Sequence, residues 1–249
     1  AAMVALNAQV ELDGVSFAEA ARRFLAGTAP AAGARQGFVD RLFAPDLMRL
    51  TGQHLALVFG SLALAVVLGV PLGVLAWRRP WLAGTVLGAV GVLQTVPSLA
   101  LLAFLIVLVG AIGFVPALLA LFLYALLPIV RNTHAGLNGV PAGLTQAARA
   151  LGLTAPQALW TVQLPLARPT LWAGVKTAAV INVGTATVAA FIGAGGLGER
   201  IVAGLAVNDG ATLLARAVPA AVLALAVQWG FDTAERLWGR GRPRPAPPD

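Results

Sequence analysis

Six polar side chains stand out because they lie within long apolar stretches. They fall into two groups, Gln94, Thr95 and Ser98 around Pro97, and Asn182, Thr185 and Thr187 farther along the chain. A polar group inside a membrane span is costly and usually faces a bundle interior or a water-filled cavity. These residues, with Pro97 as a break in the backbone ladder, are therefore candidates to line a transport path. Hydrogen bonding between neighbouring helices explains each of them equally well.

No group of residues has the composition of a catalytic or metal-binding site. Residues 47–198 contain no Asp or Glu, which excludes paired-carboxylate hydrolysis and acidic metal sites over that stretch. Cysteine is absent from the chain, and His54 and His134 each stand alone in the sequence. Lys176 is the only lysine and follows Val175, so no Gly-Lys pair exists to hold the phosphates of a nucleotide. The sequence predicts a protein that is not an enzyme and has no cofactor of its own.

The composition points to a membrane protein. Hydrophobic residues make up 59% of the 249, and charged residues only 11%, whereas soluble domains contain about 25% charged residues. The 17 Lys and Arg outnumber the 10 Asp and Glu, but the basic residues flank apolar spans instead of clustering with aromatic residues. Orientation in a bilayer explains this pattern better than binding of nucleic acid, so no nucleic-acid partner is expected.

The apolar stretches predict an all-α polytopic membrane protein with about five transmembrane helices. A helix needs about 20 apolar residues to cross the hydrocarbon core. Residues 55–76 form one such stretch, residues 82–130 are long enough for two crossings with a turn at 110–116, and residues 169–192 and 213–238 give two more. A transmembrane domain is therefore expected over 46–239, followed by a basic, proline-rich tail over 240–249.

The distribution of arginine predicts which side of the membrane each loop occupies. Most of the arginines between and after the spans fall on one side, namely Arg78, Arg79, Arg131, Arg149, Arg168, Arg236, Arg240, Arg242 and Arg244. The other side has Arg200 and Arg216, together with the arginines that precede the first span. Because basic loops stay in the cytoplasm, we expect the N-terminus outside and the C-terminus inside.

A polar interruption at residues 146–165 separates the third expected span from the fourth. It begins with strong helix formers, Gly152 is placed to end or bend that helix, and Pro156 can start a second helix. The dipeptide Leu164-Pro165 is expected to stop the second helix before the membrane. A short helix in such a loop can fit a cleft on a partner protein and transmit a push as a rigid body.

This interruption resembles the cytoplasmic coupling loop of ABC-importer permeases. The pattern of that loop is Glu-Ala-Ala, three residues, Gly, nine residues, and Ile-x-Leu-Pro. In this sequence Gln146 replaces the Glu and Val162 replaces the Ile, and the matching positions are Ala147, Ala148, Gly152, Leu164 and Pro165. The resemblance implies that a separate ATPase, which binds ATP and Mg²⁺, acts on the chain through these residues.

Other segments resemble the glycine betaine, choline and carnitine branch of these permeases. They are Pro71-Leu-Gly73, Gln94-Thr-Val-Pro97-Ser98, the stretch from Tyr124 through Pro128 and Arg131 to Thr133, Gly184-Thr-Ala-Thr187, and Ile192-Gly-Ala-Gly-Gly-Leu-Gly198. The resemblance runs from about His54 to Asp232. It implies a homodimeric pore in the bacterial inner membrane, a cytoplasmic dimer of ABC ATPases, and a substrate-binding domain or protein outside.

The N-terminal segment, residues 1–27, is polar and amphipathic, unlike the rest of the chain. It resembles the C-terminal end of the binding proteins that serve these importers, in which a Leu-Asn turn and an Asp-Gly pair precede a last helix that ends in Phe-Leu. The corresponding residues are Leu6-Asn7, Asp13-Gly14 and Phe24-Leu25. We therefore expect residues 1–27 to be the end of a fused binding domain and residues 28–45 to be its linker; an ordinary soluble extension is the alternative.

The expected function is the transmembrane permease subunit of an ATP-driven importer for quaternary ammonium osmolytes. One alternative is a permease for another small solute, such as an amino acid derivative. A second alternative, a transporter driven by an ion gradient, would need an intramembrane acid or histidine relay, which the first four expected spans lack.

Overall fold

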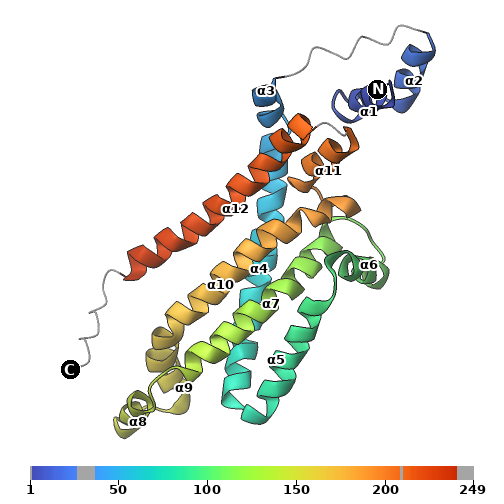
Figure 1. The fold of residues 1–249 in the computed structure, drawn as a ribbon. Coiled ribbons are helices and arrows are strands. Elements are labelled where there is room, and N and C mark those ends of the chain that lie inside the picture. Colours follow the sequence, from blue (N-terminus) through green and yellow to red (C-terminus); the bar gives the residue numbers. More distant parts are fainter. Residues whose placement is uncertain (1, 27–36, 208–209, 240–249) are drawn as a thin grey trace. The chain divides into compact units, whose positions relative to one another are not determined.

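The computed structural model describes residues 2–26, 37–207 and 210–239, and these residues form helices joined by turns, with no β-strand among them. In chain order the elements are α1 (Ala2–Glu11), α2 (Phe17–Leu25), α3 (Phe38–Leu42), α4 (Leu47–Arg78), α5 (Pro80–Thr95), α6 (Ser98–Val109), α7 (Phe114–Asn138), α8 (Ala142–Ala150), α9 (Ala155–Ala158), the π-helix η1 (Leu159–Gln163), α10 (Leu164–Ala186), the 3-10 helix η2 (Val188–Ile192), α11 (Gly198–Val207) and α12 (Gly210–Gly239) (Figure 1). The expected all-α class is confirmed.

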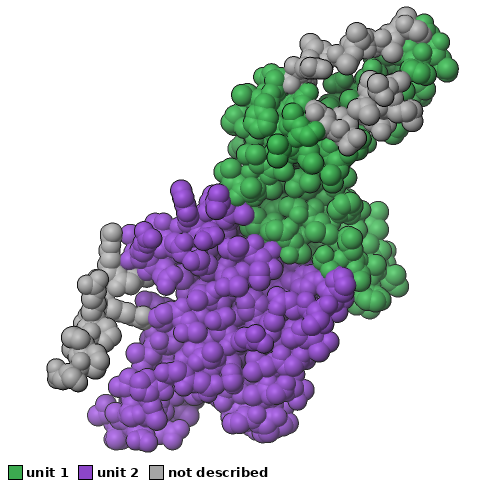
Figure 2. Space-filling model, viewed as in Figure 1, with its two compact units in different colours: residues 1–58, 98–119, 183–223 green, residues 59–97, 120–182, 224–249 purple. Residues whose placement is uncertain are grey.

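The chain forms two compact units, coloured separately in Figure 2. Unit 1 contains residues 1–58, 98–119 and 183–223, and unit 2 contains residues 59–97, 120–182 and 224–249. Each of the four long helices α4, α7, α10 and α12 contributes one part to each unit.

The number of helices able to cross a membrane is smaller than the sequence predicts. Among the described residues three helices are long and apolar enough to cross a membrane, and they end at Arg78, Asn138 and Leu237. Helices α5 and α6, which meet at a bend of 103°, add a fourth crossing if the pair counts as one span. The expected turn at 110–116 is present at residues 110–113, where Gly110 and Gly113 have φ values of +70° and +98°. The remaining expected span, 169–192, corresponds to α10 and η2, in which Lys176 and Asn182 reduce the apolar character.

Unit 1 is organised around a glycine-rich turn that His54 holds in place. The backbone N–H of Leu197 donates to His54 Nδ1 at 3.3 Å, and His54 Nε2 lies 3.0 Å from the carbonyl oxygen of Val183. Because Nδ1 accepts, Nε2 must carry the proton, so the ring is the neutral tautomer that joins α4, α10 and the turn. Gly196 has a φ of +88°, and a Cβ there would lie 3.0 Å from His54 Nδ1. Only glycine fits this backbone beside the ring.

A second buried side chain, Arg200 of α11, holds α3 in unit 1. The side chain is 1% exposed, and its guanidinium donates to the carbonyl oxygens of Arg41 and Leu42 at the end of α3. The guanidinium Nε also lies 3.8 Å from a carboxylate oxygen of Asp46. A cation at the C-terminal end of a helix satisfies carbonyls that the helix leaves open.

Unit 2 depends on glycines at the places where its helices cross. A Cβ on Gly174 of α10 would lie 2.6 Å from Asn132 Cβ and 2.7 Å from the carbonyl oxygen of Pro128, both in α7. A Cβ on Gly73 of α4 would lie 2.5 Å from Thr133 Cβ. These glycines let α7 approach α4 and α10 closely, which is the packing by small residues that membrane helices favour.

The N-terminal segment folds differently from the resemblance stated above. Helix α1 runs through Leu6-Asn7, where a turn was expected, so that part of the expectation is wrong. The expected last helix is present as α2, which ends at Phe24-Leu25 and begins after Ser16, whose Oγ accepts from the backbone N–H of Glu19 at 3.3 Å. Helix α1 packs against α11 within unit 1. Residues 28–36 of the expected linker and 240–249 of the expected tail lie outside the described residues.

Candidate coupling site and transport path

The loop between α7 and α10 begins with α8, which ends at Ala150, just before the glycine that the sequence predicts to end or bend it, Gly152. The backbone N–H of Leu153 donates to the carbonyl oxygen of Ala148 at 3.1 Å, and the backbone N–H of Gly152 donates to the carbonyl oxygen of Arg149 at 2.9 Å. Gly152 has a φ of +82°. This left-handed glycine just past a helix end satisfies the last carbonyls of α8 and reverses the chain direction.

The second helix of the loop, α9, starts where Pro156 predicts it. Thr154 is the N-cap, and its backbone N–H donates to Gln157 Oε1 at 2.8 Å. Pro156 lies in the first turn, where a missing N–H costs nothing. Both ends of the turn between α8 and α9 are therefore fixed by local hydrogen bonds, which makes the helix pair a stiff unit.

The expectation that Leu164-Pro165 stops the second helix is wrong. Helix α9 continues through η1 into α10, and the N–H of Leu164 donates to the carbonyl oxygen of Leu159, a π-type spacing. Pro165 has no N–H to donate to residue 161 and its ring crowds that carbonyl, so the helix widens by one residue instead of ending. The loop is thus joined to α10 by a helical segment.

The two halves of the loop are braced by one polar contact. Gln163 Nε2 donates to Thr145 Oγ1 at 3.4 Å, and Gln163 is 6% exposed. Ala148, Ala158 and Leu159 are also buried. The remaining residues predicted for coupling lie at the surface or are partly buried, with Gln146, Ala147, Gly152 and Pro165 exposed and Val162 and Leu164 intermediate.

The surface that the loop presents includes two large apolar side chains that the motif did not predict. Leu151 is 80% exposed and Trp160 is 71% exposed. Leu151 caps α8 and Trp160 lies in η1, so they are carried by the two braced halves of the loop. Exposed apolar side chains on a stiff polar loop are typical of a protein contact surface.

The first group of predicted path residues lies at the break between α5 and α6. Gln94 and Thr95 end α5, Pro97 lies in the break, and Ser98 starts α6. Thr95 Oγ1 donates to the carbonyl oxygen of Val92 at 2.8 Å, and Tyr124 donates to the carbonyl oxygen of Val96. The break therefore leaves backbone carbonyls for side chains to satisfy.

The second group is spread along α10 and η2. Asn182 is fully buried, and its Nδ2 donates to Ser61 Oγ at 2.9 Å while its Oδ1 has no hydrogen-bond partner in the described part of the chain. Thr185 and Thr187 are partly buried, and Thr187 Oγ1 donates to the carbonyl oxygen of Gly184 at 2.7 Å. Asn182 thus joins α4 to α10, and a role of either group in transport stays a prediction.

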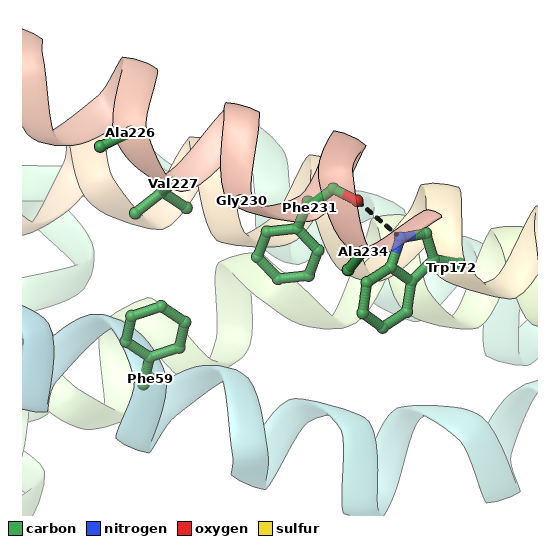
Figure 3. Close-up of a pocket in the computed structure, with 7 residues that line it drawn as sticks. All are labelled: Phe59, Trp172, Ala226, Val227, Gly230, Phe231 and Ala234. Atoms are coloured by element: carbon green, nitrogen blue, oxygen red, sulfur yellow. Dashed lines mark hydrogen bonds between the residues drawn. The ribbon is translucent and has the colours of Figure 1, made fainter. Parts of the chain in front are cut away.

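Unit 2 also contains an apolar hollow of about 360 Å³ that the sequence did not indicate. Figure 3 shows Phe59 of α4 facing Phe231 of α12, with Trp172 of α10 beside it and the small residues Ala226, Gly230 and Ala234 along one wall. The Trp172 indole N–H donates to the carbonyl oxygen of Phe231 at 3.3 Å. Lys176, one helical turn after Trp172, forms an ion pair with Asp232. These contacts attach α12 to α10, and the hollow offers almost no polar group to orient a solute.

The sequence analysis did not predict the contact between Thr145 and Gln163, because the sequence contains only a weak signal for it. Thr145 and Gln163 are 18 positions apart, outside any helical period. The one sequence cue is that Gln163 is a polar residue placed directly before Leu164-Pro165, at the beginning of an apolar helix. Within the described residues no group of three or more His, Cys, Asp or Glu side chains could hold a metal ion.

An all-helical membrane domain with a braced helix pair between two of its long helices defines the class, a permease subunit of an ABC importer. The chain belongs to the family described as binding-protein-dependent transport system inner membrane component, whose model matches residues 56–237. It is a transport subunit and not an enzyme.

Similar proteins agree with this assignment. The chain is 46% identical over 187 residues to the osmoprotectant import permease protein OsmW of Salmonella typhimurium, which covers 74% of this chain and 87% of that protein. It is 41% identical over 191 residues to the choline transport system permease protein OpuBB of Bacillus subtilis, covering 77% and 88%. Among solved structures, an inward-facing conformation of the MetNI methionine ABC transporter matches with a TM-score of 0.70 at 30% identity, over 77% of this chain and 95% of that one.

Proposed function

We propose that this chain is the permease subunit of an importer for quaternary ammonium osmolytes such as glycine betaine, choline and carnitine. The observation that carries the proposal is the identity of 46% and 41% to permeases named for osmoprotectants and for choline, over about three quarters of the chain. A third relative at 41% identity is a glycine betaine/carnitine/choline transport permease of Bacillus subtilis.

In this proposal two copies of the chain form one pore with residues 46–239, and two copies of an ABC ATPase bind on the cytoplasmic side. ATP and Mg²⁺ belong to the ATPase, because the only lysine, Lys176, lies in a helix and not in a phosphate-binding loop. The transport path would be lined by the two polar groups at Gln94–Ser98 and Asn182–Thr187. Asn182 Oδ1 is buried and has no hydrogen-bond partner among the described residues. This supports a place on the path where a conformational change supplies the partner.

Coupling would run through the loop at residues 146–165. Leu151 and Trp160 would enter a cleft on the ATPase, and Gly152 would set the angle between the two helices. Because η1 joins the loop to α10 without a break, a displacement of the loop would tilt α10 as a rigid element. ATP-driven closure of the two ATPases would bring the two loops together and switch the pore between inward and outward openings.

The proposed orientation places this loop and the C-terminal tail in the cytoplasm and residues 1–27 outside. Residues 1–27 would be the end of a fused substrate-binding domain, with 28–45 as its linker. Helix α2 supports this, because Phe17 and Leu25 are 71% and 83% exposed, as expected for a helix that another domain would cover. Hydrogen exchange on the 249-residue chain tests it. Rapid exchange in α2 agrees with the fusion, and strong protection without a partner means that α2 belongs to the permease.

Transport by the reconstituted complex tests the function. The permease, its ATPase and its binding protein are placed in proteoliposomes, and ATP-dependent uptake of labelled glycine betaine, choline, carnitine and methionine is compared. Vesicles without ATP are the control. Uptake of the quaternary ammonium solutes alone supports the proposal. Uptake of methionine instead would favour the second candidate, an amino acid importer, which the likeness to the methionine transporter supports.

A further inference from the structure

A cavity of about 470 Å³ in unit 2 lies between the end of α4 and the coupling loop. Arg78 and Arg79, at the end of α4, and Arg149, in the last turn of α8, contribute three guanidinium groups to its lining. Thr145 and Gln163, the two residues that brace the loop, line it as well. The cavity therefore has three cations on its walls and is in contact with the element that transmits movement.

No carboxylate of this cavity balances the three arginines. None of its lining residues is an acid, and residues 47–198 contain no Asp or Glu. In the described part of unit 2 the basic residues are seven, Arg78, Arg79, Arg131, Arg149, Arg168, Lys176 and Arg236, and the acids are two, Asp232 and Glu235. Asp232 already pairs with Lys176. Unit 1 is balanced by comparison, with six basic and six acidic residues among those described. The counter-charge for the cavity must come from another molecule.

The position of the cavity along α4 indicates which molecule that is. The apolar helix that is long enough to cross a membrane ends at Arg78, and basic residues at the end of such a span are typical of the headgroup layer. Trp77, the residue before them, lines the cavity and packs against the core of Leu137, Leu159 and Ala167. An indole beside arginines at a span end is typical of the membrane interface, where lipid phosphates are the abundant anions.

We propose that this cavity binds the phosphate of an anionic phospholipid headgroup, held by Arg78, Arg79 and Arg149. Guanidinium groups bind phosphate oxygens through paired charge-assisted hydrogen bonds, which suits them to this ligand. A lipid bound there touches the end of α4 on one side and α8 on the other. It therefore holds the coupling loop at a fixed height relative to the membrane surface, and removing it loosens the loop.

The test uses the permease with its ATPase in nanodiscs that contain equal amounts of phosphatidylglycerol and phosphatidylcholine. Native mass spectrometry measures which lipid stays bound to the released complex. The cavity variant is Arg79→Gln with Arg149→Gln, and the matched control is Arg131→Gln with Arg236→Gln, which removes the same charge from exposed residues that do not line the cavity. We expect the cavity variant to retain phosphatidylglycerol about thirtyfold less than the wild type and the control variant.

Three results would overturn the proposal. The first is equal retention of phosphatidylglycerol by the cavity and control variants. The second is displacement of the lipid by millimolar inorganic phosphate, which would assign the cavity to a soluble anion. The third is binding of phosphatidylglycerol only by the permease without ATPase, which would assign the arginines to the ATPase contact. If the double variant does not fold, Arg149→Gln alone, on the exposed surface of α8, is measured in the same way.

Discussion

Gln163 donates a hydrogen bond to Thr145 across the coupling loop, at 3.4 Å from Nε2 to Oγ1. The two residues belong to η1 and α8, the segments that come after and before the turn at Gly152. Gln163 is buried at the point where the loop joins α10, so this contact ties α8 to the start of α10.

Removing the brace should weaken coupling more than folding. In Gln163→Leu the side-chain volume is kept and the hydrogen bond to Thr145 is lost, which costs about 1 kcal/mol in stability. We expect normal insertion but a several-fold loss of substrate-stimulated ATPase activity, measured in proteoliposomes with the assembled complex. Thr145→Val should have the same effect, and the double variant should be no worse than either single one. Additive losses would show that the two residues act separately.

The left-handed backbone at Gly152 predicts a ranking of substitutions. A Cβ there would meet nothing within 4 Å, so the strain comes from the φ of +82° alone and amounts to about 1–2 kcal/mol for most residues. We expect Gly152→Val to insert and form dimers but to lose ATPase stimulation, and Gly152→Asn, which tolerates this backbone, to keep most of it. Full stimulation and full uptake in Gly152→Val would contradict the proposed coupling role.

The helix crossings predict opposite effects for two glycines. Gly174→Ala would place its methyl group 2.6 Å from Asn132 Cβ, and such overpacking costs about 1–3 kcal/mol. Gly84→Ala meets nothing within 4 Å and replaces glycine within a helix, which is neutral or stabilises by up to about 1 kcal/mol. Thermal unfolding of the purified permease in detergent measures both. A lower midpoint for Gly84→Ala than for Gly174→Ala would refute the crossing of α7 and α10.

The proposed orientation can be tested with single cysteines, since the chain has none of its own. Ala21→Cys places a thiol on an exposed position of α2, and Leu151→Cys places one on the coupling loop, where the native side chain is 80% exposed. In cells that express the permease without its ATPase, so that the loop is uncovered, a membrane-impermeant maleimide should label position 21 in intact cells and position 151 only after the membrane is opened. Labelling of both from outside would overturn the orientation and the coupling role of the loop together.

The sequence predicted the coupling loop better than it predicted the path of the helices around it. Gly152 and Pro156 determine local backbone geometry by themselves, and so the turn and the start of α9 followed from residue type. Pro165 showed the limit of that reasoning, because a proline that breaks one hydrogen bond can end a helix or widen it into a π-turn. Tertiary packing of Leu159 and Gln163 favours the second outcome here.

The helix crossings and the buried polar contacts could not be predicted from composition. Glycine is frequent throughout the chain, with 28 residues, so two glycines four positions apart are not informative by themselves. The pair Gly69 and Gly73 has the same spacing as the pair Gly84 and Gly88. Of these four glycines, only Gly69 and Gly73 approach another helix within the part of the chain that the structure describes. His54 stands alone in the sequence, yet it holds the backbone of a turn 143 positions away. In a helix that is apolar on every side, periodicity does not indicate which face is packed.

The exposure of Trp160 gives this protein an optical probe of its own. Its indole is 71% exposed at the surface of the coupling loop, so its emission should report the polarity around the loop directly. Burial against another protein would shift that emission to the blue and shield it from iodide quenching. The chain has five other tryptophans. In a variant in which phenylalanine replaces those five, the arrival and departure of a partner at this loop can be followed in real time, without a dye, from the fluorescence of Trp160.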